Sequence, residues 1–238
     1  SNGKGAITTN TAFGELSLNA NTSGSNNTVF GYTAAQANTT GSFNTFLGLA
    51  AGQNSTTPTG SIFLGYTAGQ NSNGTYTIAI GYSAASSGAS GTIGIGYNSA
   101  PGSGDYNTCI GYNSGGGMTS GRNNVFMGTS STTSGITTGS DNVLIGGQIV
   151  SGNVTGNAIL ADGQGNLAIR KDANGNVSLG TQSALATNAT NGFQYCRGGA
   201  GVPTGVPATA ITGHVPMYVD TTNSKMYIYS GGAWVILN

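Results

Sequence analysis

The side chains that could carry out catalysis are few and widely spaced in this chain. Its single histidine, His214, lies between Gly213 and Val215, and no nucleophile and carboxylate accompany it in a recognisable arrangement. A glycan-cleaving enzyme needs two carboxylates facing one bond. Asp105 and Asp141 instead stand at turn-like positions where equivalent segments carry Asn, Ser or Thr. We therefore expect no enzyme, and an activity on polysaccharide is the least favoured function considered.

Metal and cofactor sites are not expected either. Three copies of His214 could meet on the axis of a trimer and hold a metal ion, but a loop or packing role explains a lone histidine more simply. The glycines before Asp105 resemble one unit of a calcium-binding repeat, a motif that binds through many copies and occurs here once. Cys109 and Cys196 lie in different regions and give no disulfide framework, and Cys109 fits a small core residue.

The residues best suited to binding gather near the C-terminal end. Aromatic residues make up 8% of the chain but crowd its last stretch, beside Asp, Asn and Lys on short turns. Such groups suit carbohydrate or protein recognition, although a small trimeric knob would also need aromatic residues for its own core. The predicted receptor-binding residues are Tyr218, Asp220, Asn223, Lys225, Tyr227, Tyr229 and Trp234.

A glycine that recurs every 15–18 residues organises the first two-thirds of the chain. We number positions relative to it, so that position −1 precedes it directly. Position −1 is always a large apolar residue, position −3 is Thr, Ile or Val, position −4 is Asn, Ser or Thr, and position +1 is often Tyr. This short period is typical of a solenoid in which each repeat is one coil. The recurring glycines are Gly14, Gly31, Gly48, Gly65, Gly81, Gly96, Gly111, Gly128 and Gly146.

The repeat predicts an all-β fold, a β-solenoid or β-roll of about nine coils. Gly, Asn, Thr and Ser disfavour helices, and a coil of this length has room for two strands and two turns. Coils stacked about 4.8 Å apart would form a rod of roughly 40 Å. We expect a homotrimer, intertwined or side by side, because the strand before each glycine is apolar on both faces. We expect the face at position −2, which includes Val29, Phe46 and Cys109, to point to the trimer axis or to a neighbouring subunit.

Two polar columns of the repeat have structural and functional interpretations. The tyrosines at position +1, such as Tyr66 and Tyr82, could form a ladder on which sugars stack, although packing between coils is the favoured interpretation. The column at position −4, such as Asn27 and Asn44, predicts a hydrogen-bonded ladder that closes the turns.

The chain divides into five segments at the sequence level. Residues 1–9 form a lead-in, 10–150 the β-roll repeats, 151–180 a β-meander, 181–200 a linker, and 201–238 a C-terminal β module. In that module, three short apolar segments separated by turns predict a small antiparallel meander.

Composition excludes two classes of partner. Only 5% of the residues are charged, with six basic and six acidic side chains, so the clustered Lys and Arg of a nucleic-acid interface are missing. No apolar run approaches the roughly 20 residues of a membrane-spanning helix, and we expect no membrane insertion.

The repeat resembles two families of surface protein. Ala79-Ile80-Gly81 and Gly94-Ile95-Gly96 are similar to the core of the repeats in trimeric autotransporter adhesin heads. Asn44-Thr45-Phe46-Leu47-Gly48 resembles the collar and shaft repeats of bacteriophage tail fibres. The closing segments Asp220–Asn223 and Tyr229–Trp234 resemble a module near the ends of phage tail-fibre proteins, which favours the phage family.

This resemblance implies a structural and receptor-binding segment of a tail fibre, located in the virion. Its implied partners are two further copies of itself, a glycan or protein on the host surface, and other tail-fibre or baseplate proteins. The alternative is a bacterial surface adhesin head or an extracellular filament subunit. The chain starts at Ser1 and not at Met, and proteins resembling phage fibres often lose a C-terminal chaperone domain, so we expect a fragment or processed product. Receptor contact is expected at residues 201–238 and not along the repeats.

Overall fold

A computed structural model describes most of the repeats and parts of the remainder. The described residues are 9–100, 102, 104–129, 137–147, 153, 155–161, 167–171, 173, 177–179, 198–199, 217–220, 223, 225–230 and 232–237; for 167, 177–179, 198–199 and 217–220 only the backbone is described. Contacts divide the chain into two compact units, residues 1–184 and 185–238. Within the described residues every regular element is a β-strand, and none is a helix able to cross a membrane.

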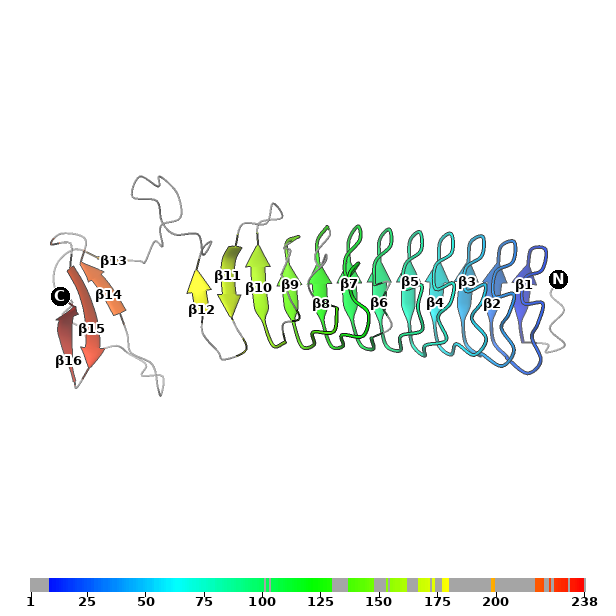
Figure 1. Cartoon of the computed structure of the whole chain (residues 1–238), viewed down its shortest axis with the longest axis horizontal. Helices are drawn as coiled ribbons and strands as arrows, with labels where there is room; N and C mark the ends of the chain where they lie inside the picture. The colour runs from blue at the N-terminus through cyan, green and yellow to red at the C-terminus, as the bar shows by residue number, and fades with distance from the viewer. Residues whose placement is uncertain are drawn as a thin grey trace. The chain divides into compact units, whose positions relative to one another are not determined.

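The first unit is a β-solenoid, as the glycine repeat predicts. Nine three-residue strands stack as parallel neighbours in strict sequence order, which makes about eight turns of the solenoid (Figure 1). Equivalent positions of adjacent coils pair, for example Val29 with Phe46 and Phe46 with Phe63. The strands are β1 (Thr11–Phe13), β2 (Thr28–Phe30), β3 (Thr45–Leu47), β4 (Ile62–Leu64), β5 (Ile78–Ile80), β6 (Ile93–Ile95), β7 (Thr108–Ile110), β8 (Val125–Met127) and β9 (Val143–Ile145).

Each described coil contains one strand of the stack, and not the two that its length allows. The residues after the glycine alternate into the left-handed region, as at Thr33 (φ 53°) and Ala35 (φ 49°), which bends the chain too often for a second extended segment. Backbone hydrogen bonds still join this side from coil to coil. The Ala35 N–H donates to the Ala51 carbonyl at 2.8 Å, and the Ala37 N–H donates to the Gln53 carbonyl at 2.9 Å.

The recurring glycine is required by the stacking of the coils. Gly31 has a φ of +145°, and a Cβ added there would lie 2.2 Å from the carbonyl oxygen of Gly48 in the next coil. The same close approach recurs at Gly48, where a Cβ would lie 2.5 Å from the carbonyl oxygen of Gly65. Any side chain would therefore push adjacent coils apart.

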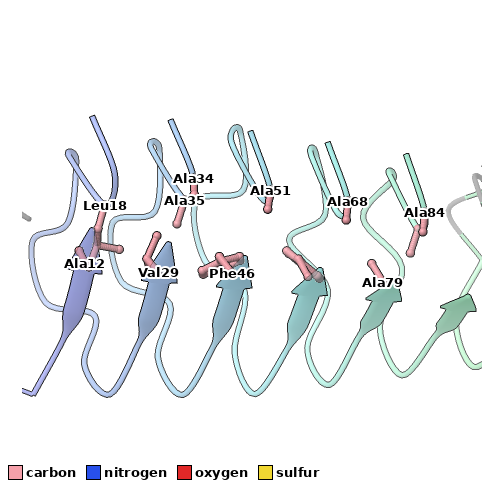
Figure 2. Close-up of a cluster of buried hydrophobic side chains, with 12 residues drawn as sticks. Ala12, Leu18, Val29, Ala34, Ala35, Phe46, Ala51, Ala68, Ala79 and Ala84 are labelled. Carbon is pink, nitrogen blue, oxygen red and sulfur yellow. The ribbon is translucent and has the colours of Figure 1, made fainter. Parts of the chain in front are cut away.

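The hydrophobic core lies inside each coil, and this corrects the expected role of position −2. Side chains at this position are buried against small residues from the opposite wall of the same roll, as Phe46, Val29 and Ala51 show in Figure 2. Strand alternation then turns positions −3 and −1 outwards. The expectation that position −2 faces an axis or another subunit is therefore wrong, because the turns fold back over it within the chain.

Beyond β10 (Ala158–Ala161) the strand pairing changes from parallel to antiparallel. Strand β10 pairs with β9 in parallel, then β11 (Leu167–Lys171) and β12 (Val177–Leu179) add antiparallel neighbours.

The second unit contains a four-stranded sheet in the order β13 (Gly198–Gly199), β14 (Met217–Asp220), β15 (Lys225–Ser230) and β16 (Ala233–Leu237). Pairing is parallel between β13 and β14 and antiparallel between β14, β15 and β16.

Candidate functional site

The outward face of the solenoid strands carries apolar side chains that are exposed or half-exposed along the described stack. We call positions −3 and −1 of strands β1–β9 the strand face. Its large apolar side chains at position −1 include Phe13, which is 63% exposed, and Leu64, which is 38% exposed. At position −3, Thr predominates at the N-terminal end and Ile or Val further along. Nothing within the described part of the chain covers these side chains.

A column of tyrosines borders the strand face at position +1. The rings of Tyr66, Tyr82, Tyr97 and Tyr112 stack in sequence, with 5.0 Å between successive centroids and interplanar angles of 10–28°. Each inner ring therefore has both of its faces against neighbouring tyrosines. A sugar needs a free ring face to stack upon, so this geometry supports the packing interpretation over a sugar ladder.

The strand face and the tyrosine column together form a large apolar surface. Seven half-exposed aromatic side chains belong to it, and with about 150–250 Å² per aromatic side chain they alone expose about 700 Å². The largest apolar patch on a typical monomer measures about 300–600 Å², and each partner in a stable complex buries about 800 Å². These aromatic residues are Phe13, Phe30, Tyr32, Tyr66, Tyr82, Tyr97 and Tyr112.

The buried column at position −4 is a hydrogen-bonded ladder, which confirms its predicted role. The Asn44 side-chain amide donates to Asn27 Oδ1 at 3.0 Å and to the Pro58 carbonyl at 2.7 Å. Asn44 Oδ1 accepts from the Ser61 N–H at 2.9 Å. The Asn44 side chain thus pairs two backbone groups of the next coil that would otherwise be buried without partners.

In the second unit, the structure brings Tyr229 and Trp234 together. The two residues are register partners on β15 and β16, and their rings meet edge to face with centroids 5.3 Å apart. Both side chains are half-buried, whereas Asn223 and Lys225 are exposed at the β14–β15 turn. The aromatic pair lies near the β15–β16 turn, whereas Asn223 and Lys225 lie at the other end of β15.

For the other three predicted receptor-binding residues, the structure describes no exposed side chain. Tyr227 is only 3% exposed and packs inside the unit, so direct contact with a receptor would require it to move. The register places the backbone of Tyr218 opposite Tyr227 and that of Asp220 opposite Lys225. The side chains of Tyr218 and Asp220 lie outside the described part of the structure.

Asp105 and Asp141 take part in the turns of the repeats, as the sequence predicts. Asp105 Oδ1 accepts a hydrogen bond from the Ser90 N–H of the preceding coil at 2.8 Å. Asp141 has a φ of 60° and accepts from the Asn123 side-chain amide at 3.1 Å. Over the described residues, no group of three His, Cys, Asp or Glu side chains could hold a metal ion. His214 and Cys196 lie outside those residues.

Cys109 is buried in the core of the roll, and this burial raises the pKa of its thiol to about 12. A thiol held neutral in an apolar interior is a packing group and a poor nucleophile.

Sequence reasoning missed a second set of exposed aromatic side chains, at position −5. Phe43, Tyr76 and Tyr106 occupy this position in alternate coils and are among the most exposed aromatic residues of the described chain. The sequence does contain a signal for this set, because each of the three residues stands five positions before a recurring glycine. Only three of the coils carry an aromatic residue at that position, however.

Comparison of the chain with protein-family models, with curated proteins and with solved structures finds no match.

Proposed function

We propose that this chain is a non-enzymatic structural and receptor-binding segment of a bacteriophage tail fibre, and that it works as a homotrimer. The single observation that carries the proposal is the uncovered strand face with its tyrosine column. An apolar surface of this extent along a solenoid is stable in water when another molecule covers it. Two further copies are the natural cover, because a cyclic trimer lets identical solenoids share one axis without growing into an open filament.

The proposed roles of the two units are different. The solenoid provides length and stiffness, since adjacent coils are hydrogen-bonded through backbone groups and through the polar side chains at position −4. The second unit provides the receptor contact, through the Tyr229–Trp234 pair and the exposed Asn223 and Lys225. A glycan or protein on the host surface is the proposed receptor, and other fibre or baseplate proteins are the proposed neighbours in the virion.

Sedimentation of the full chain tests the assembly. We expect a particle of three times the 23.5 kDa mass of one chain. Leu64→Lys, on the strand face, should give monomers or aggregates, because three ammonium groups would meet at one apolar interface. Thr57→Lys is the matched control, since Thr57 is exposed on a turn away from that face. A soluble wild-type monomer would overturn the proposal.

Electron microscopy with an antibody to this chain tests the location. We expect labelling along thin fibres attached to phage tails. Labelling of the bacterial surface without phage particles would instead support the alternative function, a bacterial adhesin head or an extracellular filament subunit.

A further inference from the structure

We propose that Phe43, Tyr76 and Tyr106 form a row on the solenoid that binds an extended glycan of equatorially linked pyranoses. This row is separate from the receptor contact proposed for the second unit, and it lies on the repeats, where the sequence predicts no receptor contact. The proposal holds for a viral fibre and for a bacterial adhesin alike.

The conformation of these residues is the first observation. Every residue at position −5 from Asn26 to Asp141 has a φ between 56° and 66°, because the chain turns there into the next strand. Glycine, asparagine and aspartate tolerate that region, whereas a bulky side chain in it is an outlier. The five coils without an aromatic residue here follow this preference, with Asn26, Gly60, Gly91, Asn123 and Asp141.

Turn formation therefore does not explain the three aromatic residues. Core packing does not explain them either, because Tyr76 is 71% exposed, Phe43 65% and Tyr106 63%. Strained residues that neither the turn nor the core requires are commonly found where a protein binds something.

The two tyrosine rings of the row pack over glycines of the preceding coils. A Cβ added to Gly60 would lie 2.8 Å from Tyr76 Cδ1, and one added to Gly91 would lie 2.6 Å from Tyr106 Cδ1. Each ring thus occupies the space that the glycine of the preceding coil leaves free, and both tyrosines take the same position relative to their coil. Such preorganisation lowers the entropic cost of binding.

The spacing of the row selects the ligand. The three residues lie two positions before β3, β5 and β7, which are alternate strands along the same edge of the stack (Figure 1). Backbone hydrogen bonds from the Tyr76 N–H to the Thr59 carbonyl and from the Tyr106 N–H to the Ser90 carbonyl keep the coils in register. Two coil spacings are about 10 Å, which is the length of two pyranose rings in an extended chain.

In a glycan linked 1,4 through equatorial bonds, successive rings are turned over, so every second sugar presents the same face. A row of aromatic rings at this interval can stack on every second sugar of such a chain. Exposed Thr75 and half-exposed Asp105, which directly precede the two tyrosines, offer oxygen atoms to the sugar hydroxyls beside the rings.

The test measures binding of the full chain to cello-oligosaccharides and chito-oligosaccharides from disaccharide to octasaccharide, with malto-oligosaccharides as a control of different linkage. We expect affinity in one of the equatorially linked series to rise when a trisaccharide spans two rings, and again when a pentasaccharide spans three. The malto-oligosaccharides should bind at least tenfold more weakly at equal length. Absence of binding to both linear series would overturn the proposal.

The variants separate the row from the rest of the surface. Tyr76→Asn with Tyr106→Asn introduces the residue that Asn26 and Asn123 provide at the same position, so the turns should fold. We expect this double variant to bind at least tenfold more weakly, with unchanged sedimentation and with thermal unfolding no lower than that of the wild type. Thr57→Asn is the control, because Thr57 is exposed on a turn and belongs neither to the row nor to the strand face and its tyrosine column, and it should bind like the wild type. Equal binding by the double variant, or a changed oligomeric state, would assign the row to another role.

Discussion

At the scale of single residues, the core depends on a size match within each coil. Phe46 at position −2 faces Gly52 at position +4, and a Cβ added to Gly52 would lie 2.6 Å from the Phe46 ring. Where position −2 is Val29, position +4 is the larger Ala35, and both are buried in the same cluster. The residues at these two positions therefore share one fixed volume inside the roll.

This match predicts a coupled pair of substitutions. Gly52→Ala should destabilise the solenoid by about 1–3 kcal/mol, because the methyl group overpacks the Phe46 ring. Adding Phe46→Val recreates the combination of Val29 with Ala35, and should recover part of that loss through a coupling of about 0.5–3 kcal/mol. Denaturant unfolding of the two single variants, the double variant and the wild type measures the coupling.

Gly88→Ala is the control for this pair, because an added Cβ there would meet no atom closer than 3.8 Å. It should leave the unfolding midpoint almost unchanged. Additive effects of Gly52→Ala and Phe46→Val would contradict the size match.

The buried thiol of Cys109 predicts a loss of stability in alkali. Burial raises the pKa of the Cys109 thiol from its ordinary value of 9.0 to about 12, so only the unfolded chain ionises between these values. The neutral thiol's contribution is complete below pH 9 and decreases by up to about 1.4 kcal/mol per pH unit above it. Cys109→Ala should lack this decrease, so the difference in unfolding free energy between the two proteins should shrink from pH 9 to pH 11.

Alkylation provides an independent measurement. In the native protein at neutral pH, iodoacetamide should leave Cys109 unmodified, and modification should follow only after unfolding. Rapid modification in native buffer would show that the thiol is accessible.

At the scale of the elements, the asparagine ladder joins the coils. Asn44→Ala removes the acceptor of the buried Ser61 N–H and the donor to the Pro58 carbonyl. Each unpaired buried group costs about 1–3 kcal/mol, so this variant should unfold at clearly lower denaturant concentration. Hydrogen exchange at the Ser61 amide should accelerate more than exchange at amides several coils away. Asn44→Ser, which copies Ser61 at the equivalent position, should be milder.

The sequence predicts where the repeating strands lie, but not which face of each strand is buried inside the roll. The interval between glycines predicts the positions of β1–β9, because a fixed period requires equivalent residues to stack. The assignment of position −2 to a subunit interface failed for a physical reason. Strand alternation shows that positions −2 and −1 lie on opposite faces, but it does not show which of the two faces the turns cover. Because the strand is apolar on both faces, no polar residue marks the face that is exposed to solvent.

The candidate sites were predictable to different degrees. The closing aromatic cluster stands out by composition, and the Tyr229–Trp234 contact follows from a short turn between two strands. The burial of Tyr227 does not follow, because it depends on packing within the unit. The row at Phe43, Tyr76 and Tyr106 needed the structure, since exposure and left-handed backbone together identify it.

At the scale of the whole molecule, coil-to-coil pairing predicts resistance to proteolysis. The Arg122 N–H donates to Ser140 Oγ at 3.1 Å, and the Arg122 carbonyl accepts from the Asp141 N–H at 3.0 Å. Trypsin requires an extended backbone, so brief digestion should spare Arg122 although its side chain is exposed. Cleavage is expected first at Arg197, in the segment that the sequence predicts to be a linker. Early cleavage at Arg122, identified by mass spectrometry, would contradict a packed coil there.

The final prediction concerns attachment to host cells. Trp234→Ala removes one ring of the Tyr229–Trp234 pair, and aromatic anchors of this kind contribute much of the energy of an interface. We expect weaker binding to host cells in a flow-cytometry assay, with unchanged sedimentation of the proposed trimer. Val235→Ala is the control. Val235 is an exposed apolar residue that directly follows Trp234 on β16, so its side chain points to the opposite face of the sheet.

Combining Trp234→Ala with Tyr76→Asn and Tyr106→Asn then separates the two proposed contacts. If both sites bind the cell surface independently, their losses of affinity should multiply in the combined variant. If only the C-terminal unit binds, the two tyrosine substitutions should add nothing to the effect of Trp234→Ala. Wild-type attachment by Trp234→Ala alone would leave the second unit without a receptor role and assign its aromatic pair to the unit's own packing.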